Sequence, residues 1–143
     1  MPTHKLRQFR PMDKAKAEAW IAALAKDLKA FPPRLDWNPR EKNGCYSFGT
    51  IHVGPRTWRG LDCLLHEFAH HIARRVPTPD EKMYGRGRRH HGPVFYACLL
   101  QVVDAAERLF GHEYDWLTEY RTLRKRRLTD RVVTRQKAAG SPQ

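Results

Sequence analysis

Residues 59–76 read RGLDCLLHEFAHHIARRV, and this stretch decides both the expected fold and the expected chemistry of the chain. Its apolar residues recur at the spacing of one helix face: Leu61, Leu65, Phe68 and Ile72. The spacing predicts an amphipathic helix over 59–76 whose apolar face packs on a core. Two prolines that follow closely, Pro77 and Pro79, end it.

The opposite face of this helix carries the pentapeptide HEFAH at residues 66–70. Positions i and i+4 of a helix lie one turn apart on the same face, so His66 and His70 can direct a ring nitrogen to one metal ion. Glu67 is rotated by about 100° from His66, so it is not placed to bind that ion but can hold a water molecule beside it. The pattern predicts a zinc-dependent hydrolase in which Glu67 is the general base.

A catalytic zinc ion needs a third protein ligand, and residues 90–95, HHGPVF, offer His90 and His91. We favour His91, because it directly precedes Gly92-Pro93 and Pro93 suits the first turn of a helix. His90 is then a surface residue or a supporting residue of the site. His71 points a further 100° or so around its helix and is not expected to be a ligand.

Cys63 leaves a second interpretation open, because it lies one turn before His66 on nearly the same face. As a fourth ligand it would close the site and make the zinc structural. Against this, HExxH sites take their third ligand from a distant segment. Cys98 fits the core at its helical spacing from Val94.

The motifs HEFAHHIA and HHGPVFYA, joined by a basic segment, together resemble the SprT-like and Spartan-like zincin metallopeptidases. Residues 43–58, NGCYSFGTIHVGPRTW, are similar to the short strands ahead of the metal helix in that family, so the resemblance spans about 40–110. It implies one zinc ion on His66, His70 and His91, Glu67 as the catalytic acid and base, and cleavage of peptide bonds.

The same resemblance implies a substrate strand, because an edge strand beside the metal helix of zincins binds the substrate backbone by strand addition. The candidates are Gly49, Thr50, Ile51, His52 and Val53.

The negative charge that develops on the carbonyl oxygen during hydrolysis needs a further hydrogen-bond donor. The candidates close to the ligands in sequence are Tyr84, Arg89, His90 and Tyr96.

The chain departs from many of these relatives because it has no CxxC pattern for a second, cysteine-rich zinc module. It resembles more the compact, stand-alone versions found in bacteria and their phages. The expected fold is therefore α+β, a small zincin-like (minimal gluzincin-like) domain. A short antiparallel or mixed sheet would pack against an N-terminal helix, the HExxH helix and C-terminal helices.

Local signals give the expected elements. A helix over 13–31 has Asp13 as its N-cap and ends at Pro32-Pro33. Strands are expected in 34–38 and 45–54, and further helices over 93–110, with Gly111 at the C-cap, and 112–127. The domain boundaries follow: an N-terminal arm over 1–12, a single domain over 13–128, and a basic, flexible tail over 129–143.

Composition excludes several classes of protein. Hydrophobic residues make up 41% of the 143 residues, without an apolar run of membrane-spanning length or an N-terminal secretory signal. Three widely spaced cysteines are no disulfide framework. We expect a monomer that contacts no membrane and works in the cytoplasm of a bacterium, or of the host if a phage encodes it.

The net charge of +12 is concentrated in two segments, 74–90 and 121–137. Clustered arginine and lysine are typical of nucleic-acid binding, so we expect nucleic-acid contacts there beside a protein or peptide substrate, and DNA-associated proteins as targets. A solvated surface explains the same charge, and no base-reading motif is present. The alternative function is that of a non-enzymatic, zinc-stabilised nucleic-acid-binding protein.

Overall fold

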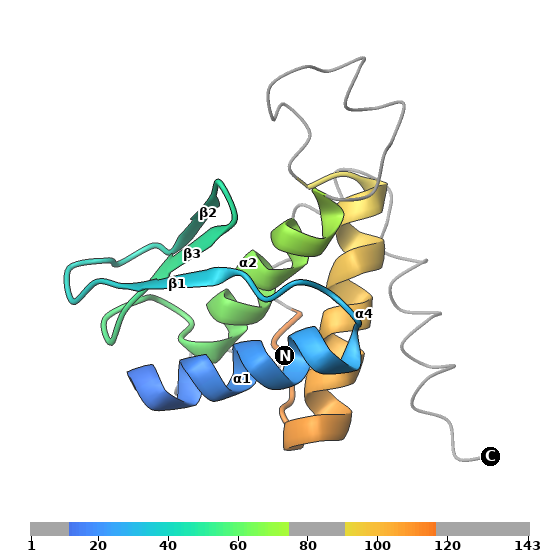
Figure 1. Ribbon diagram of the computed structural model, residues 1–143, viewed down its shortest axis with the longest axis horizontal. Helices are drawn as coiled ribbons and strands as arrows, with labels where there is room; N and C mark the ends of the chain where they lie inside the picture. Colours follow the sequence, from blue (N-terminus) through green and yellow to red (C-terminus); the bar gives the residue numbers. More distant parts are fainter. Residues whose placement is uncertain (1–11, 75–90, 117–143) are drawn as a thin grey trace, which may run out of the picture.

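The fold of residues 12–74 and 91–116 is described by a computed structural model (Figure 1). These residues form three helices and one three-stranded mixed sheet, which confirms the predicted α+β class. In chain order the elements are α1 (Lys14–Asp27), β1 (Arg34–Trp37), β2 (Cys45–Ser47), β3 (Thr50–Val53), α2 (Leu61–Ala73) and α4 (Pro93–Phe110). Most of the predicted arm and all of the predicted tail lie outside the described residues.

The sheet has the strand order β1-β3-β2. β1 runs parallel to β3, and β2 pairs antiparallel with β3 through a two-residue turn at Phe48 and Gly49. Both turn residues have positive φ, 50° and 77°, as the tight turns of hairpins require. β3 is therefore the central strand, and the prediction that residues 49–53 form an edge strand is wrong.

Helix α2 lies between the sheet and α4 and contacts both (Figure 1). Its apolar face is buried, as the sequence pattern predicts, with Leu64, Leu65 and Phe68 each at 0% exposure, and only Ile72 near its end is partly buried. Ile51 and Val53 of β3 meet this core from the sheet. Because side chains alternate along a strand, the residues between them project from the outer face of the sheet.

Two helix ends differ from the prediction. Asp13 caps α1 as expected, accepting a hydrogen bond from the Lys16 amide at 2.7 Å. The helix ends at Asp27 and not at residue 31, because Lys29 adopts a left-handed conformation with φ 53°, and Phe31 beyond it is 71% exposed. Helix α2 begins at Leu61 because Arg59 and Gly60 also have positive φ.

The N-terminal turn of α2 is fixed by a buried polar network. Asp62, 1% exposed, accepts hydrogen bonds from His112 Nε2 at 2.5 Å and from the Asp115 amide at 3.0 Å. The Arg59 guanidinium donates to the Asp115 carbonyl at 3.2 Å and lies 5.1 Å from the ring centroid of Tyr114. This network holds residues 112–115 in an irregular conformation against α2.

The predicted helix over 112–127 is therefore wrong at its start, because residues 111–115 have no helical structure. Gly111, with φ 65°, ends α4 as predicted. The remainder of that predicted helix lies outside the described residues. No helix within the described ranges has both the length and the apolar character that crossing a membrane requires.

The Asp62 carboxylate also pairs with the buried Arg59, whose Nη2 lies 3.9 Å from Oδ2. Replacing Asp62 by alanine should lower the free energy of unfolding by roughly 3–5 kcal/mol, because the buried Arg59 would lose this partner. The matched control is Asp27→Ala, which breaks an exposed pair with Arg108 at 2.9 Å and should cost much less. Urea denaturation of both variants measures the difference. Equal losses would show that the network does not anchor α2.

Candidate metal centre

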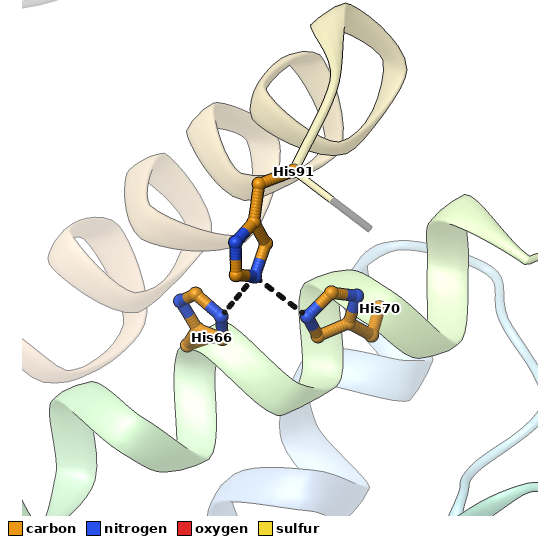
Figure 2. Close-up of side chains that lie close together, drawn as sticks. All are labelled: His66, His70 and His91. Atoms are coloured by element: carbon orange, nitrogen blue, oxygen red, sulfur yellow. Dashed lines mark hydrogen bonds between the residues drawn. The ribbon is translucent and has the colours of Figure 1, made fainter. Parts of the chain in front are cut away.

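The candidate metal centre consists of His66, His70 and His91. Figure 2 shows His66 and His70 projecting from successive turns of α2 toward His91, which lies directly before α4. The Nε2 atom of His91 lies 3.0 Å from Nε2 of His66 and 3.2 Å from Nε2 of His70. One ligand atom from each residue lies within 4.8 Å of the other two.

The local sequence explains why the third histidine reaches the pair. Pro93 begins α4 and Gly92, in an extended conformation, is its N-cap, so the chain turns sharply between His91 and the helix. Helices α2 and α4 are in contact and both contribute side chains to the core, so the start of α4 lies near the histidine pair of α2. The prediction that His91 approaches the HExxH pair is confirmed by this geometry, whereas its binding of zinc stays a prediction.

The spacing of the nitrogens fits one small cation. In a tetrahedral site with zinc–nitrogen bonds of about 2.0–2.1 Å, neighbouring ligand nitrogens lie roughly 3.3 Å apart. The two contacts to His91 are close to that spacing. Hydrogen bonding explains the cluster poorly, because Nε2 of His91 faces two nitrogens and, in a neutral ring, has either one proton or one lone pair to offer them. A cation between the rings would accept the lone pair of each Nε2 atom.

Phe95 forms the apolar side of the cluster. Its ring is 2% exposed, and its centroid lies 4.9 Å from that of His66, 4.3 Å from that of His70 and 4.8 Å from that of His91. It follows His91 by one helical turn, a spacing from which the sequence could have indicated it. By packing on all three rings, Phe95 restricts their rotation and excludes water from one side of the site.

Glu67, the predicted general base, lies between the two histidines of α2 and is 6% exposed. Burial is the main cause that raises the pKa of Cys45 and of Cys63, and the negative charge of Glu67 adds to both shifts. A carboxylate that is buried beside a cation site suits proton transfer better than a fully solvated one.

Cys63 does not join the cluster. Its thiol is directed to the backbone carbonyl of Asn43, with Sγ 3.5 Å from the oxygen. Burial, together with the charge of Glu67, raises its pKa to about 12, so that the thiol is protonated when no metal is bound. Among the described residues, the cluster therefore contains three histidines and no fourth ligand.

His71 is held away from the cluster, as the sequence predicts. Its Nδ1 lies 2.7 Å from the Tyr46 hydroxyl and its Nε2 lies 2.7 Å from the Phe31 carbonyl oxygen. The carbonyl only accepts, so Nε2 carries the proton and Nδ1 accepts from Tyr46. Tyr46 is a residue that sequence reasoning missed, because no local pattern links β2 to the end of α2.

The remaining predicted site residues divide into two groups. The first group lies outside the described residues and consists of Tyr84, Arg89 and His90, which were predicted to donate hydrogen bonds to the developing oxyanion. Tyr96 is described, and it is 2% exposed with its ring centroid 6.4 Å from that of His91. It thus lies beside the cluster, although its role as a donor stays a prediction.

Comparison of the chain with protein-family models, with curated proteins and with solved structures gave no match. The resemblance to SprT-like peptidases therefore rests on the sequence motifs alone.

Replacing His91 by alanine should abolish stoichiometric zinc binding, with an affinity loss above about 100-fold, since loss of a supporting residue alone costs up to that much. His90→Ala is the matched control and should keep the zinc. Zinc content and competition with a chromophoric chelator measure both variants. Retention of zinc by His91→Ala with loss in His90→Ala would reverse the assignment.

Proposed function

We propose that the chain is a zinc-dependent metallopeptidase that hydrolyses peptide bonds, with one zinc ion on His66, His70 and His91. The observation that carries the proposal is the convergence of three histidine Nε2 atoms, two from α2 and one from the residue before Gly92, the N-cap of α4, together with a buried glutamate in α2. A bound zinc ion would polarise the carbonyl of the scissile bond and lower the pKa of water to about 7.

Glu67 has the role of general acid and base in this proposal. It takes a proton from the attacking water and returns it to the leaving amine. Support comes from its position in α2, directly after one ligand and three residues before the other, and from its burial. The same helix therefore carries the two ligands and the proposed base.

The number of ligands favours an enzyme over a structural zinc site. Structural zinc has four protein ligands, whereas catalytic zinc has three and an open position. Within 12–74 and 91–116, three histidines gather and the nearby thiol of Cys63 is directed elsewhere. The alternative, a non-enzymatic zinc-stabilised nucleic-acid-binding protein, would need a fourth ligand at this site.

The edge strand next to the metal helix is β2, since Tyr46 of β2 contacts His71 of α2. We propose that an extended substrate pairs with β2, in place of the residues 49–53 expected from the sequence. Strand addition requires backbone groups at a sheet edge, and β3 already pairs on both sides.

The net charge of +12 supports substrates found near nucleic acid. Apart from Arg74, the two basic segments 74–90 and 121–137 lie outside the described residues. We propose DNA-associated proteins as targets on the basis of charge alone.

Replacing Glu67 by glutamine should keep one zinc ion and lower peptide hydrolysis by about 10²- to 10⁴-fold, because the proton acceptor is lost. Cleavage of casein, with and without single-stranded DNA, measures the activity of the zinc-loaded protein. The exposed Glu18 of α1 provides the matched control, and Glu18→Gln should retain full activity.

Undiminished turnover in zinc-loaded Glu67→Gln would remove Glu67 from the role of general base. Absence of cleavage by the zinc-loaded parent protein, together with DNA binding that falls steeply with salt, would favour the non-enzymatic alternative.

A further inference from the structure

The outer face of the sheet carries a second group of reactive side chains, one from each strand. Ser47 Oγ of β2 lies 3.0 Å from Nε2 of His52 in β3, and Nδ1 of His52 lies 2.8 Å from Oδ2 of Asp36 in β1. These three residues are separate from the histidine cluster, which is formed by α2 and the start of α4.

The strand register explains why the three side chains meet. Asp36 lies directly opposite His52 in the parallel pair of β1 and β3. In the antiparallel pair, Cys45 lies opposite His52 and Ser47 opposite Thr50, so Ser47 is the diagonal neighbour of His52 on the same face. The apolar residues that alternate with them, Ile51 and Val53, are buried on the inner face.

The two nitrogens of His52 have different partners, and this fixes their roles. An ionised carboxylate only accepts hydrogen bonds, so Nδ1 carries the proton and donates it to Asp36. Nε2 is then an acceptor for the hydroxyl proton of Ser47. A nucleophile, a base and a group that orients the base are therefore connected in the order that an activated serine requires.

We propose that Ser47 is a nucleophile that accepts acyl groups from small carboxylic esters, independently of the metal centre. The Ser47 oxygen attacks the ester carbonyl and forms a new C–O bond, while His52 Nε2 takes the hydroxyl proton. The bond to the leaving oxygen breaks, and His52 protonates that oxygen, which releases an alcohol. Water then attacks the acyl-serine with His52 again as base, which releases a carboxylic acid and restores Ser47.

The exposure of the group and the backbone amides beside it are compatible with small esters as substrates. The side chains of His52 and Asp36 are 28% and 52% exposed, so a small reagent reaches the group and the environment is largely aqueous. Among the described backbone groups, the amides of Phe48 and Gly49 donate to no carbonyl. The amide that follows a nucleophilic serine is a common donor to the developing oxyanion, and Phe48 has that position.

The experiment is acetylation of the zinc-loaded protein by p-nitrophenyl acetate, with the modified residue identified by mass spectrometry. Thr50 is the internal control, because its hydroxyl lies on the same face of the neighbouring strand. We expect acetyl-Ser47 to form about 10²-fold faster than acetyl-Thr50 or more, because a positioned general base usually raises the rate by that factor. Equal acetylation of Ser47 and Thr50 would overturn the proposal without any variant.

Three variants test the roles. Ser47→Ala should remove the acetyl adduct, His52→Gln should slow its formation about 10²-fold, and Asp36→Asn about 10-fold or more. Thermal melting verifies that each variant folds. Glu67→Gln should leave acetylation of Ser47 unchanged, which separates this site from the metal centre. Full acetylation in His52→Gln would show that the three residues are only a cross-strand hydrogen-bond network.

Discussion

The packing of α2 against α4 is the contact on which the candidate metal centre depends. The helix spacing of His66 and His70 places their rings on one face of α2, but only this packing brings Nε2 of His91 within 3.0 Å and 3.2 Å of theirs. A shift of one helix past the other by a single turn, about 5.4 Å, would separate the third histidine from the pair. Completely buried side chains of both helices belong to one core, among them Phe68 of α2 and Leu99 of α4, and this close packing opposes such a shift.

Polar anchors at both ends of α2 complement this apolar packing. Asp62 ties the first turn to residues 112–115, and His71 ties the last turn to β2 and to the Phe31 carbonyl. Such buried groups stabilise a fold only when each has a partner, so they also specify one orientation of the helix. Two of the three residues of the candidate metal centre thus lie on a helix that is anchored at both ends, whereas the Ser47 group lies on the exposed face of a small sheet.

The sequence predicted the features that depend on local spacing. It did not predict the features that depend on contacts between segments far apart in the chain. The ligand pair on α2 and the start of α4 at Pro93 follow from helix geometry and from the fixed φ of proline. Strand order does not follow from local spacing, because it depends on which segments pair. The structure therefore has β3 at the centre of the sheet, where the sequence had predicted an edge strand. Helical periodicity also failed after Gly111, where the contacts of Tyr114 with Arg59 override local preference. Tyr46 and the Ser47 group likewise required the register of the sheet.

Zinc K-edge X-ray absorption of the purified, zinc-loaded protein tests ligation by the three histidines, because it reports the atoms bound to the ion. We expect a four-coordinate ion with nitrogen or oxygen neighbours at about 2.0–2.1 Å, and imidazole scattering that fits three histidines. A sulfur neighbour at about 2.3 Å would contradict it, because Cys63 would then be a ligand and the site closed. Scattering that fits fewer than three imidazoles would contradict the role of His91.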